Sequence, residues 1–328
     1  MQPFAYTTAA DEATAGTMAR QGAMFIAGGT DILQLLQEGV CRAELVVDIN
    51  ALPYAGISEE FDGGVRIGAL TRLQDAADSP ILQSRCTVVA EALAATASPM
   101  VRHMATIGGN LLQRTRCLYF RDVTTPCNKR EPGSGCPAQD GENRINAILG
   151  GSEHCIAVQP SDLPVALVSL DAEVQIRRAD GALHWFNMED FHLCPGSSPE
   201  RETVLQAGDL VVAVRIPGHA TARRSHYVKV RDRASFAWAL ASAAVAVHRQ
   251  EDGTVSDIRI AVGGVATKPW RLRQVEQELL GHPFSGERIA AAAALSTTAT
   301  APRSGNAYKV LMLRHTVERA LLEVGGKA

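Results

Sequence analysis

The segment FIAGGTDILQLL, residues 25–36, decides the interpretation of the N-terminal part of the chain. A short apolar strand is expected over Met24–Ile26, and a helix is expected after the glycines because apolar residues recur at helical spacing, with Gly39 as its C-terminal cap. The sequence LVVDI, residues 45–49, predicts the next strand. Strand, glycine turn, helix and strand together make a βαβ unit.

A glycine turn between a strand and a helix can bind an anion, because its amide N–H groups and the helix N-terminus point toward the same place. Residues 27–31 have this form, and Thr30 adds a hydroxyl group. TIGGN, residues 106–110, is a second turn of the same kind. One such turn is also an ordinary tight turn, and neither is the GxGxxG of nicotinamide-binding folds. Two of them in one domain favour a cradle for a dinucleotide.

Composition limits the class of protein. The chain has 328 residues, of which 46% are hydrophobic and 20% charged, which is typical of a globular protein of two domains and excludes a disordered, collagenous or coiled-coil chain. The net charge of −3 gives no basic field that would hold nucleic acid or an anionic membrane. The apolar runs are too short to cross a bilayer, and the N-terminus lacks the pattern of a signal peptide. We therefore expect neither nucleic-acid binding nor membrane insertion.

The remaining sequence divides into two regular blocks around an irregular one. Residues 114–160 lack apolar periodicity, and so long a loop is usually functional or disordered. We place a domain boundary near 218–222, giving domains 1–218 and 222–328, the second an α+β block that ends in a helix over 308–322. Other expected elements are a strand at 65–67, a helix from Leu73, a helix at 87–97, a helix followed by a strand from 162, and a strand at 210–216.

Four of the seven cysteines fall within 39 residues, at Cys117, Cys127, Cys136 and Cys155. Four thiolates suit either a zinc ion or an iron–sulfur cluster. Their spacing, C-x9-C-x8-C-x18-C, has neither the close pairs of structural zinc sites nor the short run of ferredoxins, so both stay open. Disulfides also stay open in an oxidising compartment. The other three, Cys41, Cys86 and Cys194, are left as unassigned thiols.

Longer motifs carry a resemblance to a known family. FIAGGTDILQLL, VRIGALTRLQD, VRHMATIGGNLL, QPSDLPVALVSLDAEV, IRIAVGGVATKPWRL and YKVLMLRHTVERAL follow one another in this order. This succession resembles the FAD-binding medium subunit of the molybdenum hydroxylases, which include xanthine dehydrogenase, carbon monoxide dehydrogenase and aldehyde oxidoreductases. The resemblance implies an α+β chain: a two-part FAD-binding domain of the vanillyl-alcohol oxidase (PCMH) type, then a smaller α+β domain of the CO dehydrogenase flavoprotein type.

The resemblance also implies a set of residues around FAD. The two glycine turns would hold its pyrophosphate and ribityl chain, and an apolar pair before the 216–217 segment would lie against the ring. Asp162 would lie near the polar chain, although a helix N-cap is the simpler role for it. Lys229 would lie near the ring, although a solvated strand lysine is the simpler interpretation. The implied FAD residues are Ile26, Ala27, Gly28, Gly29, Thr30, Asp31, Ile32, Thr106, Gly109, Asn110, Asp162, Val211, Val212 and Lys229.

Fifty residues separate Asn110 from Ser161, far more than the short loop of most family members, so the chain carries an insertion over about 113–158. RTRCLYFRD, PCNKREPGSGC and SEHCIAVQPSD resemble the flavin subunit of the bacterial periplasmic aldehyde oxidoreductase, which has an extra [4Fe-4S] cluster in this loop. The resemblance therefore implies a [4Fe-4S] cluster on Cys117, Cys127, Cys136 and Cys155. Five basic residues within 114–130 would offset its negative charge, and His154 is expected at the surface.

These implications predict an FAD and [4Fe-4S] electron-transfer subunit of a molybdenum-dependent aldehyde oxidoreductase. Its partners would be a large subunit with the molybdenum cofactor and a small subunit with [2Fe-2S] clusters, in a heterotrimer. Substrate chemistry would take place on the partner, so no catalytic residue is assigned here. The alternatives are a flavin subunit of a 4-hydroxybenzoyl-CoA-reductase-like enzyme and a scaffold subunit with a structural zinc site on the four cysteines. Periplasmic residence by export with a partner's signal is expected, with the cytoplasm as the alternative.

Overall fold

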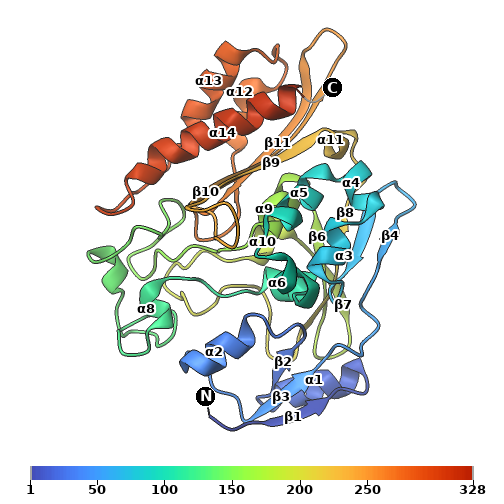
Figure 1. Ribbon diagram of the computed structural model, residues 1–328, viewed down its shortest axis with the longest axis vertical. Helices are drawn as coiled ribbons and strands as arrows, with labels where there is room; N and C mark the ends of the chain where they lie inside the picture. Colours follow the sequence, from blue (N-terminus) through green and yellow to red (C-terminus); the bar gives the residue numbers. More distant parts are fainter. Residues whose placement is uncertain (1, 327–328) are drawn as a thin grey trace.

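The computed structural model describes residues 2–326 and contains three β-sheets that follow one another along the long axis of the molecule (Figure 1). The smallest sheet is parallel, with β3 (Leu45–Asp48) between β1 (Ala5–Thr8) and β2 (Met24–Ile26). The helices α1 (Glu12–Arg20) and α2 (Ile32–Glu38) connect its strands. The predicted βαβ unit is confirmed.

The glycine that ends α2 behaves as the sequence indicates. Gly39 has φ 75° and caps the helix in the left-handed conformation, which a side chain would disfavour.

The second sheet is antiparallel and carries most helices of the first domain on its faces. Its strand order is β4 (Ile57–Glu59), β5 (Val65–Gly68), β8 (Leu210–Ile216), β6 (Glu173–Arg177), β7 (Leu183–Asn187). The helices are α3 (Leu73–Ala77), α4 (Pro80–Arg85), α5 (Thr87–Ala95), α6 (Pro99–Met104), α7 (Ile107–Leu111), α9 (Leu163–Ser169) and α10 (Met188–Phe191). Strand and helix side chains such as Ile67, Leu93, Leu167 and Val214 share one core.

The third sheet forms the C-terminal block, with strand order β12 (Trp270–Arg271), β11 (Val255–Gly263), β10 (Ala241–Arg249), β9 (Ser225–Val230). Before it comes α11 (Ala220–Arg223), and against it pack α12 (Arg273–Leu279), α13 (Gly286–Leu295) and α14 (Tyr308–Gly326). The sheet is therefore covered by helices on one face and by α5 and α9 of the first domain on the other.

The alanine-rich part of the third sheet follows from this double burial. Along β10, Ala243 and Val245 face the C-terminal helices, whereas Ala244 and Ala246 face the core of the first domain. A strand buried on both faces has no solvent side for polar residues, and small side chains let α9 come close.

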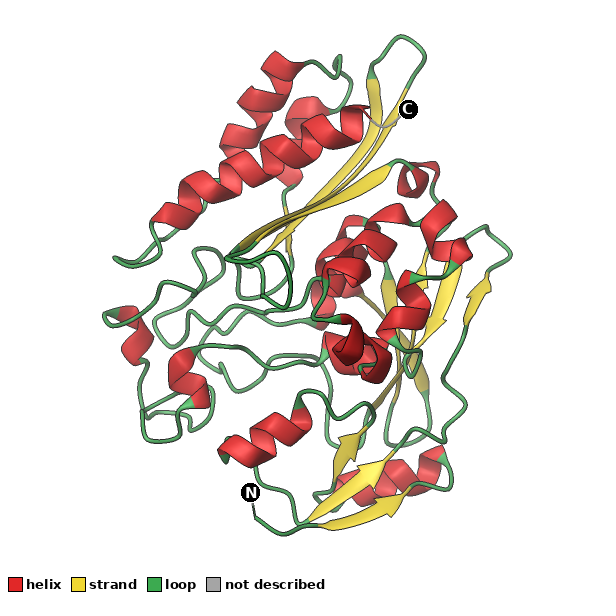
Figure 2. Ribbon diagram, viewed as in Figure 1, coloured by secondary structure: helices red, strands yellow, loops and turns green. Residues whose placement is uncertain are grey.

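The insertion is the least regular region, as the sequence indicates. It contains only α8 (Leu118–Arg121) and a turn of 3-10 helix, η1 (Pro137–Gln139), and otherwise runs as loops beside α2 and below α14 (Figures 1 and 2). A small apolar cluster, including Phe120 and Ile156, gives it a core of its own.

Candidate functional site

The two glycine turns pack directly against each other. A Cβ on Gly28 would lie 1.9 Å from the carbonyl oxygen of Met104, just before the second turn, so no larger residue fits there. Gly29 has φ 73°, and Thr106 begins the one-turn helix α7 by accepting a hydrogen bond from the N–H of Gly109. The second turn is thus a short helix. Because the backbones touch, the amide groups of both turns border one cleft.

That cleft consists of two cavities that share Thr30, Asp31 and Gly109. The first has a volume of about 280 Å³, lies between the turns and is open to solvent. The second has a volume of about 100 Å³ and extends toward the third sheet. The first is close to the lower end of the range of ligand sites, and the second extends it. Predicted residues that line the cleft are Ala27, Gly28, Gly29, Thr30, Asp31, Ile32, Thr106, Gly109, Asn110, Asp162, Val211 and Lys229.

Two predicted residues lie outside the lining of the cleft. Ile26 is at the end of β2, behind Gly29. Val212 belongs to the core beneath the N-terminal sheet and is 1% exposed, whereas Leu210 and Val211 line the first cavity. Their contact with a cofactor stays a prediction, and the geometry favours Val211 over its neighbour.

A buried ion pair closes the far end of the second cavity. The Nζ atom of Lys229 lies 2.7 Å from Oδ2 of Asp162, and both side chains are 4% exposed. Lys229 also donates to the carbonyl of Ala95, and Thr96 donates to Asp162. Lys229 is therefore not a solvated strand lysine. Asp162 stands at the N-cap position of α9, but its side chain makes no capping hydrogen bond.

Tyr227 completes this network and was not predicted. Its hydroxyl donates to Oδ1 of Asp162 over 2.8 Å. Burial, and then the Asp162 charge, raise the pKa of Tyr227 well above its usual value, so the phenol keeps its proton. The signal that could have found it is strand periodicity, since Tyr227 and Lys229 are two residues apart on β9 and lie on one face.

On the side of the insertion, the cleft is bounded by Arg116 and Trp238. The Arg116 guanidinium lies 4.5 Å from the Trp238 ring centroid and 2.7 Å from Oδ1 of Asp31. Sequence analysis did not single out Trp238 and counted Arg116 only as one basic residue among five. No local pattern marks either, because their contact joins residues far apart in the chain.

The cysteines of the insertion share one neighbourhood. Cys117, Cys127 and Cys155 are buried in the small apolar cluster, and Cys136 packs against it. Burial raises the pKa of Cys155 to about 12 and that of Cys136 above its ordinary value. Within residues 2–326, however, no three His, Cys, Asp or Glu side chains are arranged to hold a metal ion, and all seven cysteines are free. The predicted ligand set is thus gathered but not in ligating geometry. His154 is exposed, as expected.

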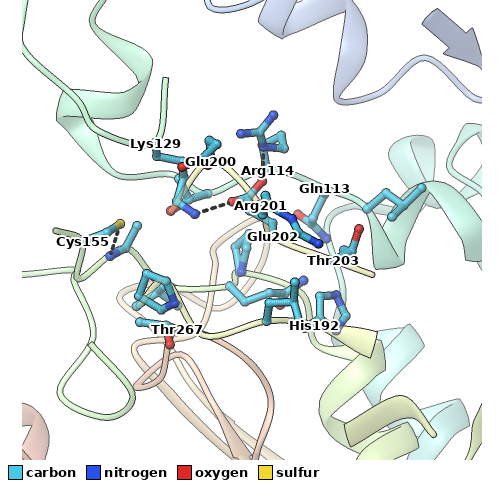
Figure 3. A pocket seen from close by; sticks show the side chains of 18 of the residues that line it. Gln113, Arg114, Lys129, Cys155, His192, Glu200, Arg201, Glu202, Thr203 and Thr267 are labelled. Carbon is cyan, nitrogen blue, oxygen red and sulfur yellow. Dashed lines mark hydrogen bonds and ion pairs between the residues drawn. The ribbon is translucent and has the colours of Figure 1, made fainter. Parts of the chain in front are cut away.

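A polar pocket lies beside Cys155 (Figure 3). Glu202 forms ion pairs there with Arg114 and Lys129, and Cys155 lines the same wall. His192 is fully buried and bonds to the Leu111 carbonyl through Nε2. Burial lowers the pKa of His192 to about 4, so its ring is neutral at physiological pH.

The fold and this cleft define a flavoprotein class, and comparison with known families agrees. Residues 2–219 match the FAD binding domain in molybdopterin dehydrogenase, and residues 226–324 match the CO dehydrogenase flavoprotein C-terminal domain. The chain belongs to the family of FAD-binding medium subunits of the molybdenum hydroxylases, and the predicted fold class is confirmed.

Several relatives are similar over nearly the whole chain. The aldehyde oxidoreductase FAD-binding subunit PaoB of Escherichia coli is 40% identical over 331 residues, covering 100% of both chains. The carbon monoxide dehydrogenase medium chain of Hydrogenophaga pseudoflava is 30% identical over 304 residues, 91% of this chain and 88% of that one. The structure of carbon monoxide dehydrogenase from that organism matches with a TM-score of 0.75 at 28% identity, covering 98% of each chain.

The groups that line the cleft suit the parts of FAD. The close glycine approach suits a pyrophosphate, and the buried lysine and the apolar Val211 suit the polar and apolar parts of a flavin. The family membership supports FAD binding by this chain. In the part of the chain that the structure describes, no helix is long and apolar enough to span a membrane.

Proposed function

We propose that the chain is the electron-transferring flavin subunit of a molybdenum-dependent aldehyde oxidoreductase. The observation that carries this proposal is the cleft between the paired glycine turns, in a chain 40% identical to a protein named as the FAD-binding subunit of an aldehyde oxidoreductase. FAD, when bound, would accept the electrons released when the substrate is oxidised on a partner subunit, and would pass them to an external acceptor. The residues of this chain bind and orient it.

The side chains that line the cleft favour cofactor binding by this chain and substrate oxidation by a partner subunit. The charged side chains that line the cleft are paired, above all Asp162 with Lys229 and Asp31 with arginines. Groups held in ion pairs position a cofactor well but are poor proton donors and acceptors. Aldehyde oxidation is therefore assigned to a partner with the molybdenum cofactor, and electrons would arrive through a small [2Fe-2S] subunit in a heterotrimer.

We also propose that Cys117, Cys127, Cys136 and Cys155 bind a [4Fe-4S] cluster. Their common apolar neighbourhood and the basic residues around it support this assignment. The cysteines are not in ligating geometry, so the cluster requires a local rearrangement, as in other segments that metals order. Iron, zinc and acid-labile sulfide analysis tests it. Four iron and four sulfide per chain are expected; one zinc without sulfide would support the scaffold alternative and overturn the cluster.

The substrate class is tested on the complex assembled with its partners. Aldehydes are expected to reduce the bound flavin, and reduction should require the molybdenum subunit. Turnover with an aroyl-CoA thioester and none with aldehydes would instead favour the reductase alternative. Periplasmic residence is proposed with the complex, and cell fractionation that finds it only in the cytosol would remove that part.

A further inference from the structure

The last residue of the first glycine turn joins the cleft to the insertion. The backbone of the turn borders the cleft, but the Asp31 carboxylate points to the insertion and accepts three hydrogen bonds from it. The donors are the N–H of Arg114 at 2.8 Å and the guanidinium groups of Arg116 at 2.7 Å and Arg121 at 3.1 Å. The Asp31 side chain is 16% exposed, so these charge-assisted bonds are partly shielded from water.

Arg116 is the donor in this group that also borders the second cavity. Its guanidinium bonds to Asp31 and Gln34 and stacks on Trp238. Arg116 and Trp238 line both the second cavity and a further cavity that reaches Cys117. One side chain thus contacts the FAD-binding turn, forms part of the wall of the cleft, and directly precedes the first cysteine of the insertion.

Apolar packing joins the same two parts independently. Helix α2 begins directly after Asp31, and its Leu35 is buried in the cluster with Cys117, Phe120 and Cys155. Arg121 of α8 also pairs with Glu38 at the end of α2. The order of the insertion therefore bears on α2 and on the turn that precedes it, which the close approach of Gly28 to Met104 leaves little room to shift.

We propose that Arg116 is a positioning residue that couples FAD binding in the cleft to the order of the cysteine-bearing insertion, through its contacts with Asp31 and Trp238. This rests on the proposed flavin function. By linkage, if an ordered insertion favours bound FAD, bound FAD favours the ordered insertion by the same factor. The insertion would then be a part of the flavin site as well as a place for cysteines.

The test combines FAD affinity with hydrogen exchange of the whole chain, measured by mass spectrometry with and without FAD. In the wild type, FAD should slow exchange of peptides within 114–130 by roughly tenfold. Arg116→Met should weaken FAD binding by about tenfold or more and abolish that FAD-dependent protection. Arg116→Lys should recover the affinity in part, because an ammonium can pair with Asp31 but lacks the planar fork that reaches Gln34 as well.

Two further variants serve as a second test of the coupling and as its control. Trp238→Leu changes a side chain that is 45% exposed, so the fold should survive while the coupling weakens. Glu131→Gln is the control: Glu131 is also in the insertion, but its side chain is exposed. It should leave the FAD-dependent protection intact. Wild-type affinity and protection in both Arg116→Met and Trp238→Leu would overturn the coupling. A wild type that binds no FAD would overturn the proposed function instead.

Discussion

The Nζ atom of Lys229 and the carboxylate of Asp162 form a buried ion pair, 2.7 Å apart, that joins the two domains at the end of the cleft. Lys229 is on β9 of the C-terminal block, and Asp162 begins α9 of the first domain. Both residues line the second cavity, so the pair fixes the relative position of the two domains at the point where each contributes to the cleft.

Loss of the lysine should be costly. Lys229→Met leaves the Asp162 charge buried with only Thr96 and Tyr227 as partners, and breaking a buried pair in this way costs about 3–5 kcal/mol. Urea unfolding should show this loss, and the double variant Lys229→Met/Asp162→Asn should regain part of it. The control is Arg288→Met, which breaks an exposed pair with Glu278 and should cost under about 1 kcal/mol. If Lys229→Met and Arg288→Met lowered the free energy of unfolding equally, this account would be contradicted.

Tyr227 should contribute to stability through its hydrogen bond to Asp162. Tyr227→Phe removes the donor to Asp162 and keeps the ring in the core, so the unfolding free energy should fall by about 1.5–3 kcal/mol, as for a bond to a charged group. In the Asp162→Asn background the same change should cost less. A full double-mutant cycle by urea unfolding measures the difference, and strict additivity would show that the two side chains do not interact.

The contact between the glycine turns should affect the affinity for FAD more than the free energy of unfolding. Gly28→Ala places a methyl group on the Met104 carbonyl and must push the turns apart, at a cost of about 1–3 kcal/mol. FAD affinity, measured by quenching of flavin fluorescence, should fall by at least about tenfold. Gly286→Ala is the control, because a Cβ there meets no atom within 4 Å and its φ is unexceptional. Unchanged FAD affinity in Gly28→Ala would refute the cradle.

Stability should depend on pH through His192. Burial holds its folded pKa at about 4, below the ordinary value of 6.5, so the folded state binds fewer protons than the unfolded state between these values. The free energy of unfolding therefore has its full value with respect to His192 above about pH 6.5. It falls by up to about 3 kcal/mol as the pH falls toward 4. His192→Gln keeps a donor without titrating and should flatten this dependence. The exposed His248, changed to Gln, should leave the slope as in the wild type.

The sequence was informative where local patterns determine structure. Glycines before a helix and short apolar runs predicted the βαβ unit and β8 correctly, because the contacts that form them are close in sequence or follow the strand itself. TIGGN was predicted as a turn, but Ile107–Leu111 form a short helix with Thr106 as its N-cap. The two glycines in this segment favour a loop in a sequence-based prediction.

The rest of the site depends on contacts between distant segments. Arg116 meets Trp238, and Tyr227 meets Asp162, only after the third sheet has packed on the first domain. The same packing decided between alternatives that the residues alone left open: Lys229 is paired and buried, and Asp162 binds it in place of capping α9. For the cysteines, a common neighbourhood followed from the sequence but a ligating arrangement did not.

The flavin content of the chain, purified gently with its partners, tests the central claim most directly. Acid extraction followed by chromatography should release one FAD per chain from the wild type and from Gly286→Ala, and far less from Gly28→Ala and Arg116→Met. A wild-type complex that oxidises its substrate yet contains no flavin on this chain would contradict the account.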